Sequence, residues 1–162
     1  MDLETKQTLV MIPNLEIEIW NRDGKTIDII KTHNIIHSVG LNSFRNLIGY
    51  PNLQPGGTGY TPEYIAIGSD GTTPALSHTA LFTEVFRKNI TSRFAQGDDR
   101  LHWQLRVETT EANGGGTQAL RECAIYSVPT GGVAWMRAIH TLINKSSAIG
   151  VTYNWRLTLA NA

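Results

Sequence analysis

The C-terminal stretch of this sequence constrains the fold more than any other feature. Between Ile149 and Leu159 every second residue is large and apolar, whereas the residues between them are small or polar. The apolar set is Ile149, Val151, Tyr153, Trp155, Leu157 and Leu159. A period of two over this length is typical of a β-strand with one buried face and one wet face, and it excludes an amphipathic helix. We therefore expect a sheet protein that is closed by its own last strand.

The same alternation recurs along the chain and predicts a mainly β fold. Residues 101–109 alternate clearly, and residues 15–20 and 26–30 flank an Asp-Gly pair that favours a tight hairpin turn. Further strands are expected at 64–68, 85–94, 119–127 and 133–140. Many strands joined by short turns that contain Gly and Pro indicate an antiparallel β-sandwich or barrel. The long consecutive strands after residue 85 favour a jelly-roll-like sandwich.

One short helix is expected between residues 38 and 49. Phe44, Leu47 and Ile48, together with Val39 or Leu41, fall on one helical face. Ser38 can cap the start of this helix, and Gly49 followed by Pro51 can end it. Residues 50–62 are rich in Pro and Gly and are expected to form a loop.

Residues 1–14 show no clean period and contain Pro13. We interpret them as an extended N-terminal arm that orders against another surface, with a frayed terminus as the alternative. The expected organisation is therefore an arm over 1–14 and a single β-sandwich domain over 15–162. Neither a repeat nor a second domain boundary is evident.

The composition of the chain argues against nucleic acid and membranes as binding partners. The 14 Lys and Arg residues balance 14 Asp and Glu residues and are scattered, which argues against a nucleic-acid groove. No apolar run approaches the roughly 20 residues of a membrane span, and the N-terminus lacks the features of a secretory signal. We expect a protein made in a cytoplasm that binds neither nucleic acid nor membrane.

The sequence offers no convincing catalytic, cofactor or metal site. His33 and His37 lie four residues apart, but both precede the expected helix, and no other ligand type stands at a suitable spacing. The single cysteine, Cys123, lies within an expected strand, so a buried inert thiol is favoured over a nucleophile. His102 and His140 alternate with apolar residues and are expected to face solvent or an interface. We expect no enzyme activity and no cofactor.

The tryptophans are expected to serve packing. Trp103, Trp135 and Trp155 fall on apolar strand faces, so core or subunit-interface packing is favoured over a sugar-stacking platform. Trp20 breaks the alternation of its strand, so the pattern does not assign it to a face. A carbohydrate-binding or hydrolytic sandwich stays open as a third hypothesis, and an exposed cluster of Trp20, Tyr50 and Tyr60 would favour it.

Several segments, in order and spacing, resemble a recurrent family of tailed-bacteriophage virion proteins. They are Asn34 to Ile48, Tyr64 to Leu81, Glu84 to Lys88, Leu120 to Tyr126, and the closing stretch Ala134 to Leu159 with its Lys145-Ser-Ser. The resemblance covers most of residues 34–159. It implies a β-rich, non-enzymatic, oligomeric structural part of a virion.

Two locations in the virion follow from this resemblance. The first hypothesis is a capsid decoration (cement) protein that binds as an oligomer, by analogy a trimer, across junctions of the major capsid protein and stabilises the shell. The alternative is a tail, baseplate or tail-fibre-associated structural or adaptor protein. The expected contacts with partners are residues 1–14, the loop 50–62 and the loop 111–118.

Overall fold

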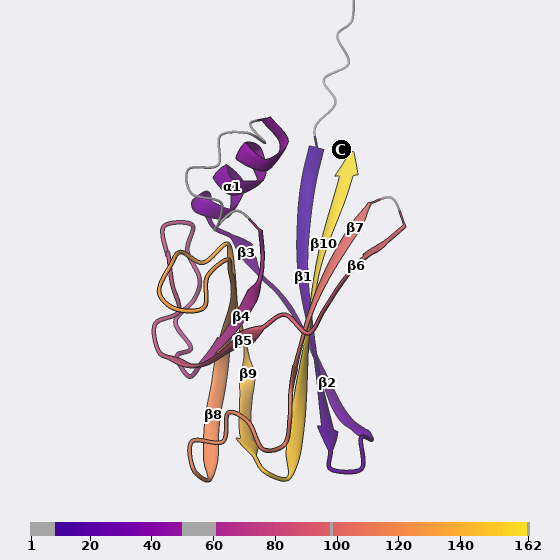
Figure 1. Ribbon diagram of the computed structural model, residues 1–162, viewed down its shortest axis with the longest axis vertical. Helices are drawn as coiled ribbons and strands as arrows, with labels where there is room; N and C mark the ends of the chain where they lie inside the picture. Colours follow the sequence, from indigo (N-terminus) through magenta and orange to yellow (C-terminus); the bar gives the residue numbers. More distant parts are fainter. Residues whose placement is uncertain (1–8, 50–60, 98, 162) are drawn as a thin grey trace, which may run out of the picture.

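The computed structural model describes residues 9–49, 61–97 and 99–161, which form two five-stranded antiparallel sheets and one helix (Figure 1). Sheet A has the strand order β2-β1-β10-β7-β6, and sheet B has the order β3-β9-β8-β4-β5. The two sheets pack against each other in a sandwich-like arrangement, which confirms the predicted mainly β, antiparallel fold with one short helix.

The strands of sheet A are β1 (Leu9–Asn21), β2 (Thr26–His33), β6 (Ser92–Gln96), β7 (Arg100–Val107) and β10 (Ile149–Asn161). Those of sheet B are β3 (Ile35–Ile36), β4 (Tyr64–Gly68), β5 (Glu84–Asn89), β8 (Thr117–Tyr126) and β9 (Met136–Ser146). The helix α1 spans Ser38–Gly49, the bounds expected from the sequence. The expected hairpin turn joins β1 to β2, and Gly24 there has a φ of 77°, which Gly adopts without strain.

The first and last strands pair along their whole length. Every residue of β1 from Leu9 to Asn21 has a partner in β10, beginning with Leu9 opposite Asn161. The prediction of an arm over 1–14 is therefore wrong for residues 9–14, and residues 1–8 lie outside the described residues. Pro13 does not interrupt the strand because β2 begins to pair only at Asn14, so Pro13 has a single strand neighbour.

The core lies between the sheets and is formed by the apolar residues of the alternating strands. Val151, Tyr153, Trp155 and Leu157 of β10 are fully buried, as the sequence predicts. Trp103 and Trp135 are also buried. These side chains belong to one continuous cluster with residues of both sheets, so the two sheets share a single core.

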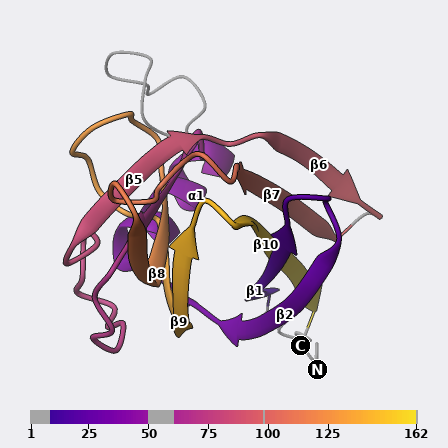
Figure 2. The same cartoon turned by 90° about the horizontal axis from the view of Figure 1, so that it is seen from below.

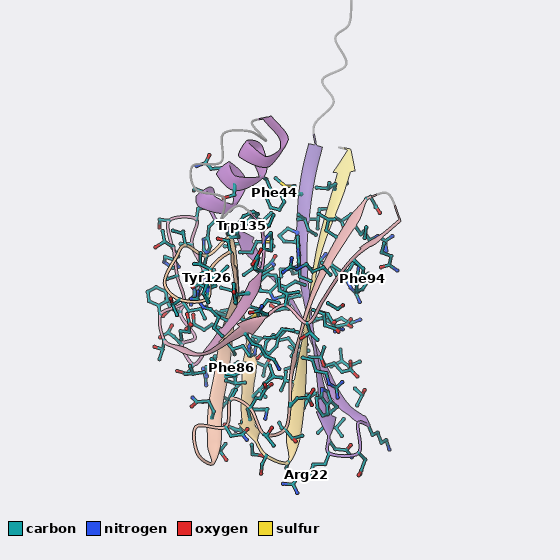
Figure 3. The ribbon with its side chains drawn as sticks, in the orientation of Figure 1. Arg22, Phe44, Phe86, Phe94, Tyr126 and Trp135 are labelled. Atoms are coloured by element: carbon teal, nitrogen blue, oxygen red, sulfur yellow. The ribbon has the colours of Figure 1, made fainter. Side chains whose placement is uncertain are left out.

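Helix α1 covers one end of the sandwich. Phe44 packs edge-on against Trp135, with ring centroids 5.3 Å apart (Figure 3). Leu41 is exposed, so it does not share the buried face, and the side chains of Val39, Leu47 and Ile48 lie outside the described part. The Ser38 hydroxyl donates to the Leu76 carbonyl at 3.4 Å instead of capping the helix.

The predicted strand 85–94 is in fact two strands in different sheets. β5 belongs to sheet B and β6 to sheet A, and the chain crosses between them at Ile90 and Thr91 (Figure 2). The Ile90 N–H donates to the Glu63 carbonyl at 2.8 Å, and the Thr91 N–H donates to the Gln104 carbonyl at 2.7 Å. Sequence periodicity continues through this crossing because Ile90 is buried at the edge between the sheets.

Gly150→Ala should lower the free energy of unfolding by roughly 1–3 kcal/mol. The six-membered ring of Trp20 lies over Gly150, and an added methyl group would overlap it. Urea unfolding would measure the loss. Gly116→Ala is the matched control, since a methyl group there meets nothing within 4 Å, and its effect should stay within about 0.5 kcal/mol. Equal stabilities of the two variants would contradict the packing of Trp20 on the sheet.

Candidate functional site

The outer faces of the two sheets differ in whether other segments cover them. Loops 69–83 and 127–135 lie over the outer face of sheet B, where Ala66, Ala124 and Tyr126 form a small second core with Leu81 and Ala134. The described chain lays no such layer over the outer face of sheet A (Figures 1 and 2). Within the described residues, the outer face of sheet B is therefore covered and that of sheet A is uncovered; we call them the closed face and the open face.

A buried ion pair fixes the closed face. Glu122 on β8 and Arg137 on β9 are both fully buried, and the Arg137 Nε and Nη2 atoms lie 2.9 and 2.8 Å from Glu122 Oε2. The Thr83 N–H donates to Glu122 Oε1 at 2.9 Å. Gly68 on β4 makes room for this carboxylate, because a Cβ there would collide with Glu122 and with the Thr83 carbonyl.

Further polar contacts hold the covering loops to the sheet. The Tyr126 hydroxyl accepts from the Leu81 N–H at 2.9 Å. Arg87 stacks on the Tyr126 ring at 3.7 Å and donates to the Val128 and Gly131 carbonyls at 2.9 Å. The guanidinium groups of Arg87 and Arg137 therefore hydrogen-bond to other parts of the same chain, and this gives the cluster a structural role.

Two histidines lie beside the ion pair without forming a catalytic arrangement. His37 is buried, its Nδ1 is 3.0 Å from the Ala75 carbonyl, and burial lowers its pKa. His78 Nδ1 accepts from the Ala75 N–H at 3.1 Å. In the described residues, no histidine side chain hydrogen-bonds to a serine, threonine or cysteine side chain, so the structure assembles no nucleophile and base there.

The open face of sheet A mixes polar and apolar side chains and carries a groove. Its outward polar residues include Asn14 and Glu16 on β1, Lys31 and His33 on β2, and Arg156 and Thr158 on β10, and Ile12, Ile29 and Phe94 are exposed on the same face. Together with Asp99 from the β6–β7 turn and Arg100 at the start of β7, these polar residues line an open hollow of about 600 Å³. This volume lies within the range of ligand sites in proteins.

Aromatic side chains on the same face are largely engaged by neighbours. Arg106 lies 3.9 Å above the ring of Trp20, whose Nε1 donates to Thr152 Oγ1 at 3.1 Å. Trp20 is only 5% exposed, so it provides no sugar-stacking surface, and Tyr50 and Tyr60 lie outside the described residues. Phe94 is half exposed on the side facing away from sheet B (Figure 3), and its ring stacks on His102 at 4.6 Å.

The histidines and the cysteine singled out in the sequence lie in separate environments. His33 Nδ1 contacts Asn14 Oδ1 at 3.2 Å on the open face, whereas His37 lies under loop 69–83. Cys123 is fully buried, and burial raises the pKa of its thiol well above the usual value, as expected for an inert thiol. His102 does not face solvent, because the ring of Phe94 covers it, and the alternative that it faces an interface stays a prediction.

The expected contact loops have different outcomes. Loop 50–62 lies almost entirely outside the described residues. Loop 111–118 is anchored to the sandwich: Glu111 pairs with Lys88 at 2.8 Å, and Asn113 Oδ1 accepts from the buried Lys145 Nζ at 2.7 Å. Sequence reasoning missed this anchor and the Glu122–Arg137 pair, because both depend on which strands are neighbours.

Comparisons with known proteins add no family to this description. No protein-family model, curated protein or solved structure matches the chain. Within the described residues, no group of three or more His, Cys, Asp and Glu residues is placed to hold a metal ion. In the same residues, no helix has the length and apolarity needed to span a membrane.

Glu122→Gln should destabilise the protein by about 3–5 kcal/mol, because it leaves the buried Arg137 with Asp70, 3.9 Å from its Nη2 atom, as the remaining counter-charge. Denaturant unfolding would measure this loss. Glu108→Gln is the control, since Glu108 pairs with Arg106 at the surface and its loss should cost less than about 1 kcal/mol. Similar small effects in both variants would contradict the structural role of the buried pair.

His140 should make the protein less stable in mild acid. Burial lowers its pKa to about 4, whereas an unfolded histidine titrates near 6.5. Between these pH values His140 is protonated in the unfolded chain but not in the native protein. The free energy of unfolding therefore falls as the pH drops from about 6.5 towards 4. We expect His140→Gln to remove up to roughly 3 kcal/mol of this pH-dependent loss.

Unfolding free energies at pH 7 and pH 4.5 for both proteins would test the His140 prediction. His37 and His102, whose pKa values are also lowered by burial, remain in both proteins, so the difference in slope isolates His140. Identical pH slopes would contradict the prediction.

Proposed function

We propose that this chain is a non-enzymatic structural protein of a tailed-phage virion. The favoured role is a capsid decoration protein that binds as an oligomer, by analogy a trimer, across junctions of the major capsid protein and stabilises the shell. The family resemblance of segments 34–48 and 64–92 supports this proposal. The structural observation that carries it is the contrast between the closed face of sheet B and the open, grooved face of sheet A.

A rigid module with one open face is suited to docking. Glu122, Arg137 and Arg87 bind the loops to sheet B, so these loops need little further ordering when a partner attaches. The open face presents side chains from central strands β1 and β10, which the sheet holds in fixed positions. Association then loses less conformational entropy than it would with a loop-built surface.

A tail, baseplate or tail-fibre-associated adaptor is the second candidate. The sandwich is elongated, and β1 and β10 extend together to one end of it (Figure 1). Leu9 and Asn161 are register partners, so the first and last described residues leave from the same end. This geometry suits end-on attachment, which an adaptor between coaxial parts requires.

The copy number of the chain in purified virions tests both candidates. We expect quantitative mass spectrometry to give a ratio to the major capsid protein of order one, as decoration of the shell requires. A ratio of a few per cent would assign the chain to the tail. Absence from particles, measured against a soluble host protein as the contamination control, would overturn the proposed function.

A further inference from the structure

The groove on the open face of sheet A has an uneven charge balance. Three cationic side chains, Lys31, Arg100 and Arg156, gather around two carboxylates, Glu16 and Asp99. Glu16 is shared, since it lies 3.5 Å from Lys31 Nζ and 3.6 Å from Arg156 Nη2. Burial and the neighbouring guanidiniums lower the pKa of His102, which lies opposite Arg156 on β7, and so disfavour its charged form. The three cations exceed the two carboxylates by one, so these five side chains carry a formal net charge of +1.

The cations of the groove keep their hydrogen-bond donors available. The distances of 3.4 to 3.6 Å from Lys31, Arg100 and Arg156 to their carboxylates exceed the usual 2.7–3.2 Å of an N–H···O hydrogen bond. Among the described residues, these three side chains donate no hydrogen bond, in contrast to Arg87 and Arg137 on the closed face. A guanidinium offers a planar fork of donors that matches a carboxylate in two-point geometry.

We propose that this groove binds a carboxylate side chain from an acidic segment of the protein on which the module docks. Arg156, on the central strand β10, supplies the two-point contact, and Lys31 and Arg100 flank it. A carboxylate carries the single negative charge that balances the excess of one cation in the groove, whereas a dianionic phosphate would leave the groove with a net negative charge. This inference rests on the proposed docking function and names the partner's chemistry.

A peptide-binding experiment tests the groove directly. The probe is a hexaglutamate peptide with blocked ends, and its controls are the hexaglutamine peptide and inorganic phosphate. Amide chemical shifts of the purified full chain would report binding. We expect shifts around Arg156 and Arg100 with the glutamate peptide only. Equal binding of the glutamine peptide, stronger binding of phosphate, or no shift at these residues would overturn the inference.

Two variants on the same face sharpen the test. Arg156→Gln should weaken binding of the glutamate peptide by about tenfold or more. Arg106→Gln is the matched control, because Arg106 lies on the same face but pairs with Glu108 and Trp20 outside the groove. Equal losses of peptide affinity in the two variants would show that only the net charge of the protein matters, and would overturn the inference. Thermal unfolding would verify that both variants are folded.

Incorporation into particles separates this inference from the proposed function. If the wild-type chain is present in virions and Arg156→Gln is incorporated equally well, the groove inference fails while the proposed function stands. If the wild-type chain is absent from virions, the proposed function fails irrespective of the peptide result. A change in oligomeric state caused by Arg156→Gln alone would identify the occupant as a second copy and overturn the proposed partner.

Discussion

The antiparallel pairing of β1 with β10 is the interaction on which the remaining structure depends. It joins the two ends of the described chain over thirteen residues each and places both strands at the centre of sheet A. Leu15, Ile17 and Ile19 on β1 then face the same core as Tyr153 and Trp155 on β10. These contacts join residues that are distant in sequence, so the entropy cost of closing the long loop between them must be met before they stabilise the fold. This is typical of slowly folding β proteins.

The same pairing makes the open face a precise surface. Outward residues of adjacent strands are brought into rows by the register, so that His102, Arg156, Asn14 and His33 lie across four neighbouring strands. No short sequence segment contains this set. Its geometry comes from main-chain hydrogen bonds and a buried opposite face, which together prevent a register slip of one residue from turning every side chain over.

The sequence predicts the fold class well because each long strand has one apolar face, and a period of two is a direct consequence of strand geometry. It predicts neither the strand order nor the sheet crossing at Ile90, since periodicity does not reveal which strands are neighbours. The arm hypothesis failed at residues 9–14 because Pro13 is tolerated beside a single neighbouring strand. The buried Glu122 and Arg137 occupy polar positions of alternating strands, which ordinarily face solvent, and loop 69–83 is what buries them.

Arg137 and Arg156 illustrate how one residue type takes opposite roles on the two faces. Arg137 is fully buried and hydrogen-bonded to Glu122, so its desolvation is offset by contacts within the chain, and removing Glu122 leaves it with the more distant Asp70, 3.9 Å away, as its counter-charge. Arg156 has a side chain that is 44% exposed and lies 3.6 Å from a glutamate that it shares with Lys31. Solvent screens that contact, which therefore contributes little to stability. A partner that brings in a carboxylate would exclude solvent from around Arg156 and so strengthen the attraction between the two charges. Arg156 therefore contributes little to folding but can contribute to binding.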